Sequence, residues 1–158
     1  MASKKYLLPG FLIGRCTADD YLKWLSGRAV SHVRRDRKRG HTEARREAYM
    51  IAINAAVLRS GGVDDYTGEN LAWESINTYD NAKSQEGRRL YKKSLGMMPT
   101  VDHFGDDLTA DEFRICSWRT NDCKNDLSDE ELVDFCRTVL AYDKKRARAK
   151  LKEAKQKR

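Results

Sequence analysis

The sequence contains no apolar run long enough to cross a membrane. Its one apolar stretch near the start, residues 6–13, is short and is broken by Pro9 and Gly10. That stretch also lacks a small-residue cleavage site, so we do not expect a signal peptide. These absences predict a cytoplasmic protein with no membrane partner.

Cysteine pairs with metal-binding spacing are also absent. The chain has four cysteines but no C-x-x-C pair, which argues against a zinc ribbon and against a disulfide framework. In the cytoplasm we expect reduced, partly buried thiols. The four positions are Cys16, Cys116, Cys123 and Cys136.

Charge is abundant and unevenly distributed. With 35% charged and 40% apolar residues in a chain of 158, we expect one domain with a modest core and a small appended arm. The net charge is +7 for residues 1–47, −8 for 48–143 and +8 for 144–158. Basic arms attract phosphate backbones, and an acidic middle suits a site that collects carboxylates around a cation. The alternative is that a highly charged small protein segregates its charge by chance.

Two N-terminal helices are predicted to pack as a hairpin. The first is expected to start at a Thr17 cap and to run through the basic block 32–39. Thr42 is the predicted cap of the second helix, which Gly61-Gly62 should end. The stripe expected to be buried on the second helix is Ala44, Ala48, Ile51, Ala52 and Ala55.

The middle of the chain changes to turns and short strands. Residues 64–69 have turn chemistry, and the polar stretch 75–93 is either helix or loop. Strands are predicted at 97–101, where a proline is tolerated at an edge, and at 113–118, where apolar and polar residues alternate.

The C-terminal part is predicted to be helical. Ser128 with Glu131 forms a capping box that opens a helix. From Lys144 onward the chain is rich in Lys, Arg and Ala, and is either a helical extension or a solvated arm. The apolar residues expected along this helix are Leu132, Phe135, Cys136, Val139 and Leu140.

Two segments carry residues suited to metal-dependent hydrolysis. Asp102 and His103 close the first predicted strand, where successive side chains point to opposite faces. A hairpin followed by a helical turn near Asn121 can bring this residue close to Asp102. Carboxylate and carboxamide oxygens suit Mg²⁺, and a histidine that is neutral near pH 7 can take a proton from water.

In these segments the sequence resembles the HNH, or ββα-metal, nucleases. The resemblance covers roughly residues 64–126 and includes the Tyr-Thr-Gly-Glu turn at 66–69 and the Val-Asp-His strand end. It also includes an Asn-x-x-Lys-x-Asp pattern that begins at Asn121. The resemblance implies that Asp102 and Asn121 bind one Mg²⁺ or Mn²⁺ ion and that His103 is the general base.

The fold that the resemblance implies is α+β, mainly helical, with a small antiparallel β-hairpin and a helix forming the ββα-metal motif. The expected divisions are an N-terminal helical hairpin with its basic block (1–62), an HNH-like core with the C-terminal helix (63–142) and a basic tail (143–158).

Two further residues take supporting roles in this hypothesis, and one family feature is missing. Glu112, before the second strand, would support the site, and Asn125 is the alternative ligand if the helical register differs. Asp64 or Asp65 stands where family members commonly carry a cysteine. We therefore expect no structural zinc.

Basic side chains are expected to contact phosphate. Arg119 and Lys124 would neutralise phosphate oxygens, although Lys124 is equally well explained as a helix-surface charge. The basic block is either a solvated helix end or a clamp on the DNA backbone, and His32 and His41 within or beside it should face solvent or phosphate. The block residues named for this role are Arg34, Arg35, Arg37, Lys38 and Arg39.

The predicted function is an HNH-type endonuclease that hydrolyses phosphodiester bonds in DNA, with RNA as the alternative substrate. The rival hypothesis is a non-catalytic DNA- or RNA-binding protein on the same scaffold. A third is an interaction protein whose basic tail binds acidic partners. No module for base-specific readout is present in the sequence.

Overall fold

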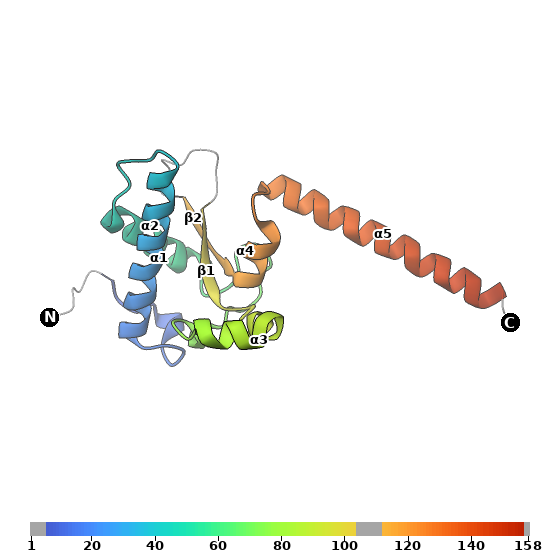
Figure 1. Ribbon diagram of the computed structural model, residues 1–158, viewed down its shortest axis with the longest axis horizontal. Helices are drawn as coiled ribbons and strands as arrows, with labels where there is room; N and C mark the ends of the chain where they lie inside the picture. Colours follow the sequence, from blue (N-terminus) through green and yellow to red (C-terminus); the bar gives the residue numbers. More distant parts are fainter. Residues whose placement is uncertain (1–5, 104–111, 157–158) are drawn as a thin grey trace. The chain divides into compact units, whose positions relative to one another are not determined.

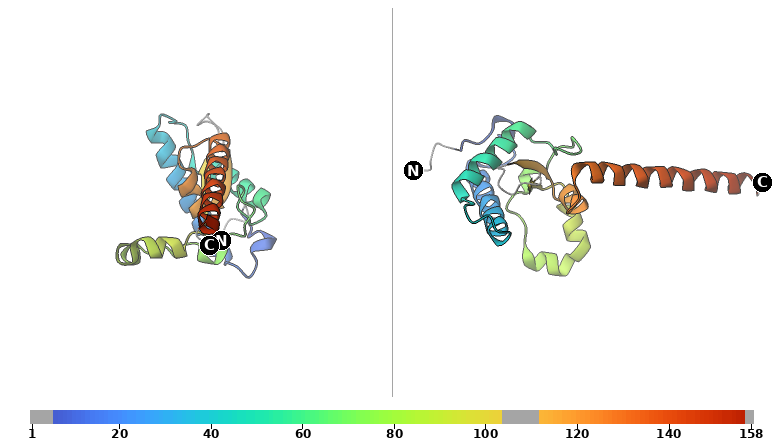
Figure 2. Two further views of the ribbon diagram at one scale, coloured as in Figure 1. Left: turned by 90° about the vertical axis from the view of Figure 1, so that its right-hand side faces the viewer. Right: turned by 90° about the horizontal axis from the view of Figure 1, so that it is seen from above.

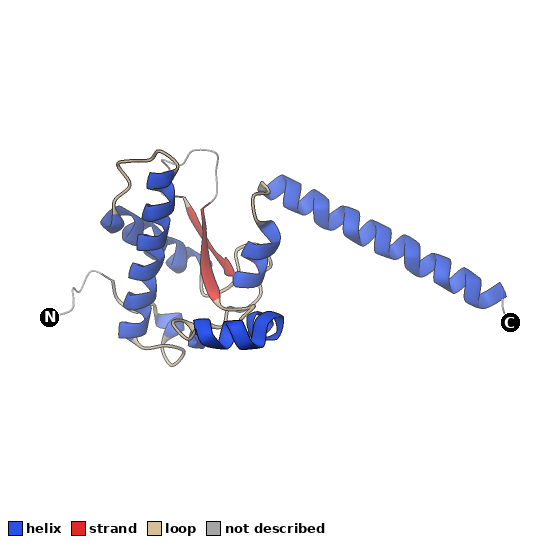
Figure 3. Ribbon diagram, in the orientation of Figure 1, coloured by secondary structure: helices blue, strands red, loops and turns tan. Residues whose placement is uncertain are grey.

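The computed structural model describes residues 6–103 and 112–156. It shows a mainly helical α+β protein with a two-stranded antiparallel hairpin (Figure 1, Figure 3), which confirms the expected fold class at that level. In chain order the elements are the 3-10 helix η1 (Gly10–Leu12), α1 (Ala18–Lys38), α2 (Arg46–Ser60), the 3-10 helix η2 (Trp73–Ser75), α3 (Asn81–Ser94), β1 (Pro99–His103), β2 (Phe113–Ser117), α4 (Trp118–Lys124) and α5 (Asp129–Gln156).

The chain divides into two compact units, Met1–Cys123 and Lys124–Arg158. The first unit holds the hydrophobic core, and the second consists mainly of α5, which has no buried residue. The basic tail continues α5 as a helical extension as far as Gln156 (Figure 2). Among the described residues, no helix combines the length and apolar character needed to cross a membrane.

Helix α1 begins where the sequence predicts. Thr17 Oγ1 accepts a hydrogen bond from the backbone amide of Asp20 at 3.0 Å, and this satisfies one of the amides that a helix start leaves without a partner. Acidic residues in the first turn and basic residues in the last turn complement the helix dipole. The basic block therefore belongs to the C-terminal end of α1.

Helix α2 differs from its prediction at the start and in its buried face. It begins at Arg46 without a side-chain cap, so the predicted cap at Thr42 is wrong, whereas Gly61 ends it in the left-handed conformation (φ 60°), as predicted. Ile51 is 48% exposed, so the predicted stripe is out of phase. The helix instead buries larger side chains, which removes more apolar area from water. Its buried residues are Tyr49, Met50, Ile53, Ala56, Val57 and Ser60.

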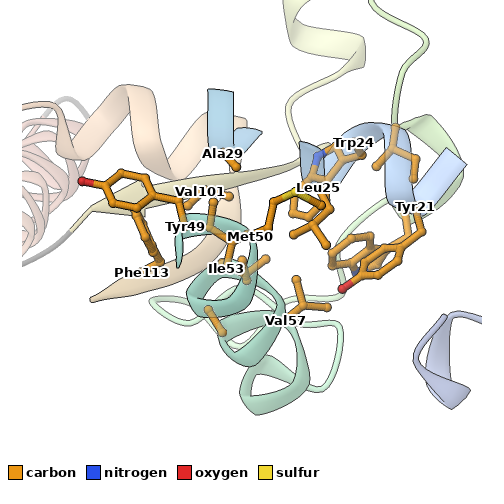
Figure 4. Close-up of a cluster of buried hydrophobic side chains, with 14 of the residues drawn as sticks. Tyr21, Trp24, Leu25, Ala29, Tyr49, Met50, Ile53, Val57, Val101 and Phe113 are labelled. Atoms are coloured by element: carbon orange, nitrogen blue, oxygen red, sulfur yellow. The ribbon is translucent and has the colours of Figure 1, made fainter. Parts of the chain in front are cut away.

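The hairpin packs one face on α1 and α2. In the antiparallel pairing Val101 lies opposite Ile115, and His103 lies opposite Phe113. Val101 and Phe113 belong to the same buried cluster as the inward side chains of both helices (Figure 4). Both predicted strands exist: the first begins two residues later than predicted and ends at His103, as expected, and the second ends one residue earlier.

An aromatic group fixes the start of β1 in this core. The rings of Trp24 and Trp73 meet edge to face with centroids 5.2 Å apart, and Tyr21 stacks on Trp24 at 6.2 Å. Trp24 Nε1 donates a hydrogen bond to the carbonyl of Pro99 at 3.2 Å. Trp73 Nε1 donates to the carbonyl of Gly62 at 3.1 Å. Both indole N–H groups are therefore satisfied inside the core.

The capping box of the last helix is confirmed. The Ser128 amide donates to the Glu131 carboxylate at 2.8 Å, and the Glu131 amide donates to Ser128 Oγ at 3.2 Å. This reciprocal pair sets the start of α5 at Asp129.

Candidate active site on the hairpin

The side chains of Asp102 and His103 project from opposite faces of the hairpin. Successive strand residues alternate, and Val101 and Phe113 point into the core beside α1 and α2. His103, opposite Phe113, therefore lies on the core side. Asp102, opposite Arg114, lies on the other side. Figure 1 shows α1 on one side of the strands and α4 on the other, where α4 runs back beside the strands after β2.

The Asp102 carboxylate is held in place by a tyrosine from the 64–69 turn. Asp102 is only 8% exposed, and its Oδ2 accepts a hydrogen bond from the Tyr66 hydroxyl at 2.5 Å. The guanidinium of Arg114 lies over the Tyr66 ring, 5.2 Å from its centroid. The Asp102 carboxylate, the Tyr66 phenol and the Arg114 guanidinium therefore lie together on the side of the hairpin where α4 lies.

Asp64 joins this turn to the end of β2 and the start of α4. Its Oδ2 accepts hydrogen bonds from the Ser117 amide at 2.8 Å and from the Thr120 hydroxyl at 2.7 Å. Its Oδ1 accepts from the Tyr66 amide at 2.9 Å. Burial raises the pKa of Asp64, but these hydrogen bonds outweigh it and leave the pKa below its ordinary value. One buried carboxylate thus positions the segments that carry Tyr66 and Asn121.

The neighbouring Asp65 anchors the same turn to β2. Its amide donates to the Ile115 carbonyl at 2.9 Å, and its Oδ2 accepts from the Ile115 amide at 2.9 Å. Burial raises the pKa of Asp65, only partly offset by this hydrogen bond and by nearby arginines. The turn is therefore tied to the hairpin at two adjacent residues.

His103 lies among aromatic rings, one of which is a buried histidine. Its ring centroid is 4.9 Å from that of Phe113 and 6.4 Å from that of His32. His32 is 2% exposed, so the expectation that it faces solvent or phosphate is wrong. Burial, with added repulsion from Arg35 and His103, lowers the pKa of His32 to about 3.

The burial of His32 carries a signal that the sequence reasoning missed. His32 lies on the same helical stripe as Leu25, Ala29 and Val33, all of which are buried. Because the segment contains so many arginines, its charge alone suggests full exposure, although one face of the helix is apolar. The Nδ1 atom of His32 is buried and has no hydrogen-bond partner among the residues that the structure describes.

The remaining predicted ligands occupy three different settings. Asn121 lies on α4, partly exposed, one residue after the buried Thr120. Glu112 is exposed immediately before β2. Asn125 does not continue the helix, because α4 ends at Lys124 and Asn125 adopts a left-handed conformation (φ 47°). The expectation that Asn125 lies one helical turn after Asn121 is therefore not met.

The predicted phosphate-binding residues are mostly at the surface. Arg119 is half exposed and forms an ion pair with Glu69, whereas Lys124 is 6% exposed. The side chains of the basic block on α1 are exposed, and Arg37 Nε donates to the carbonyl of Ala44 at 3.0 Å. The exposed block residues are Arg34, Arg35, Arg37, Lys38 and Arg39.

A second basic surface lies between α3 and α4 and was not predicted. A groove of about 260 Å³ there brings three cations of α3 to the start of α4. Trp118 adds a partly exposed indole that meets the Tyr79 ring edge to face at 5.3 Å. The basic side chains that line the groove are Arg89, Lys92, Lys93 and Arg119.

The comparisons with known proteins add no relative. No family model, curated protein or solved structure matches the chain at a significant level.

The donor set at the hairpin suits a cation that takes few protein ligands. Within residues 6–103 and 112–156, no three His, Cys, Asp or Glu side chains converge on one point. Asp102 supplies a fixed carboxylate, and Asn121 lies on the helix that returns along the same side. Mg²⁺ accepts such a sparse oxygen set, because it keeps several of its waters and also binds substrate phosphate.

Proposed function

We propose that the protein is a metal-dependent endonuclease that hydrolyses phosphodiester bonds in DNA, with RNA as the alternative substrate. The supporting observation is that α4 returns along the hairpin on the side where Asp102 is held by Tyr66. Asp102 and Asn121 would hold one Mg²⁺ or Mn²⁺ ion. When bound, the ion would neutralise negative charge on the phosphate and on the leaving 3′ oxygen.

His103 would act as the general base. It would take a proton from water as the water oxygen bonds to phosphorus and the bond to the 3′ oxygen breaks. Because His103 and Asp102 leave opposite faces of β1, the phosphate would lie across the end of that strand. His32 behind His103 is neutral at physiological pH, since its pKa is about 3. It therefore adds no positive charge beside His103.

Nicking of a supercoiled plasmid tests this proposal. Purified protein with Mg²⁺ or Mn²⁺ should convert the plasmid to open circles, and a chelator should stop the reaction. His103→Ala and Asn121→Ala should each lower the rate by about a hundredfold or more. His41→Ala, a histidine outside the site, should cut like the wild type. Equal cutting by all variants would identify a contaminating nuclease and overturn the proposal.

Two single variants distinguish Asn121 from Asn125 as the amide ligand of the metal. If Asn121 is the ligand, Asn121→Ala loses activity and Asn125→Ala keeps it. The reverse result would move the ligand to Asn125 and contradict the role given to α4. Both variants should bind DNA as tightly as the wild type when no metal is added, because neither residue carries charge.

A second candidate function is nucleic-acid binding without cleavage. It is favoured by the exposed basic block on α1 and by the groove between α3 and α4. Salt-dependent DNA binding with no metal-dependent nicking would support this second function and reject the first.

A further inference from the structure

Helix α5 presents an apolar surface along which no residue is buried. Its 28 residues, Asp129–Gln156, correspond to about 42 Å of helix. Several large apolar side chains are at least 46% exposed, which is unusual for so many neighbours on one helix. The exposed residues are Val133, Phe135, Val139, Leu140, Tyr142 and Leu151.

These residues include part of a seam with coiled-coil spacing. Positions three and four residues apart in alternation follow one side of α5 for its whole length. The first half of the seam carries larger apolar side chains, whereas the second half carries two alanines and a lysine, with Leu151 beside the seam. Its members are Val133, Cys136, Leu140, Asp143, Ala147, Lys150 and Ala154.

The charge of α5 changes sign at the middle of the helix. Residues 129–143 carry five acidic and one basic side chain, a net charge of −4. Residues 144–156 carry seven basic and one acidic side chain, a net charge of +6. The two halves have nearly equal length, so a second α5 running in the opposite direction matches this pattern from end to end.

We infer that α5 is a self-association surface on which two copies of this chain pair in antiparallel orientation. The acidic half of each helix then lies against the basic half of the other. Cys136 then faces an alanine of the other copy, Ala147 or Ala154, which allows the two helices to approach closely there. A parallel pair would place the two acidic halves together, each with a net charge of −4, and the two basic halves together, each with a net charge of +6. Repulsion between like charges disfavours that orientation.

Native Cys136 allows the orientation to be measured directly. In an antiparallel heptad pair, Cys136 faces position 147 or 154 of the other copy, depending on which of two registers forms. Ala147→Cys and Ala154→Cys are therefore introduced separately into the full chain. Residues 136 and 147 of one helix lie about 16 Å apart, so a disulfide between them joins two molecules.

Mild oxidation followed by peptide mapping should find Cys136 linked to the new cysteine in one of the two variants. Links between two copies of Cys136 in the wild type would indicate a parallel pair and overturn the proposal. Finding neither link would overturn it as well.

Sedimentation equilibrium gives the second test. The wild type should be dimeric, and Leu140→Asn in the seam should weaken the dimer by about tenfold or more. Thr138→Asn introduces the same polar side chain on the opposite side of the helix and should leave the dimer intact. A wild type that is monomeric at all concentrations, with α5 packed on its own first unit or open to other partners, contradicts the inference. Because no residue of the hairpin site is involved, either result is independent of the nuclease proposal.

Discussion

The hydroxyl of Tyr66 donates a hydrogen bond to Oδ2 of Asp102, and this contact joins the 64–69 turn to the first strand of the hairpin. A hydrogen bond to a buried carboxylate orients that group for any ligand it holds. Removal of the hydroxyl in Tyr66→Phe should lower metal-dependent cleavage by about tenfold and the free energy of unfolding by about 2 kcal/mol. Plasmid nicking and urea denaturation measure the two effects.

The matched control for this variant is Tyr79→Phe. Tyr79 is 40% exposed and contacts the Trp118 and Tyr91 rings, away from Asp102. Its substitution should change neither quantity. Cleavage that survives unchanged in Tyr66→Phe would show that Asp102 does not depend on this contact.

Thr120 should be among the most sensitive positions of α4. Its hydroxyl donates to Asp64 at 2.7 Å and accepts from the Ser117 hydroxyl at 2.8 Å inside the core. Thr120→Val keeps the shape but leaves the buried Asp64 carboxylate without this donor. We expect a loss of about 2 kcal/mol in urea denaturation. Thr42→Val, at an exposed position that caps no helix, should change the free energy of unfolding by less than about 0.5 kcal/mol. Equal losses of stability in Thr120→Val and Thr42→Val would contradict the role of Asp64.

His32 should make stability fall in mild acid. Its pKa is about 3 in the folded protein, against about 6.5 in an unfolded chain. Between these values the unfolded state binds more protons, so acid favours unfolding. The contribution of His32 to the free energy of unfolding is complete above about pH 6.5. As the pH falls below about 6, this contribution should decrease by about 1.4 kcal/mol per pH unit.

Urea denaturation at several pH values between 7.5 and 4.5 gives this slope. His32→Leu should flatten the curve, whereas His41→Leu should leave it as in the wild type. If His32→Leu and wild type lose stability in parallel, His32 is not buried in its neutral form.

Two basic surfaces can be compared by the salt dependence of DNA affinity. Each phosphate contact contributes a slope of about 0.9 when log affinity is plotted against log salt. Substituting Arg35 and Lys38 with alanine should lower the slope by up to about 1.8, and substituting Lys92 and Lys93 tests the groove in the same way. Lys23→Ala, on α1 but outside the block, serves as the control. An unchanged slope for a pair would remove that surface from the interface.

Local signals in the sequence predicted the helix ends well. The cap at Thr17, the stop at Gly61 and the box at Ser128 each depend on hydrogen bonds or backbone angles within a few residues. The cap at Thr42 failed because the chain stays non-helical until Arg46, where no capping side chain is used. Which face of α2 is buried also escaped prediction, since it depends on how much area Tyr49 and its neighbours can bury against the hairpin.

The candidate site was predictable only in part. The order hairpin then helix, with Asp102 near the end of the first strand, follows from residue pattern. The Tyr66 contact joins residues 36 positions apart, and the Asp64 contacts join residues more than 50 apart. Such long-range hydrogen bonds leave no periodic trace in the sequence. The ligand roles of Asp102 and Asn121 and the base role of His103 stay predictions.

The position of the tryptophans determines what unfolding experiments will report. The three tryptophans, Trp24, Trp73 and Trp118, all lie in the first unit, and α5 contains none. Intrinsic fluorescence will therefore follow the first unit alone, while far-ultraviolet circular dichroism will weigh the 28 residues of α5 heavily. The two probes should give different transition curves whenever the units melt separately. Such a difference would mark two structural units with different stabilities and should not be taken for an intermediate in the folding of the core.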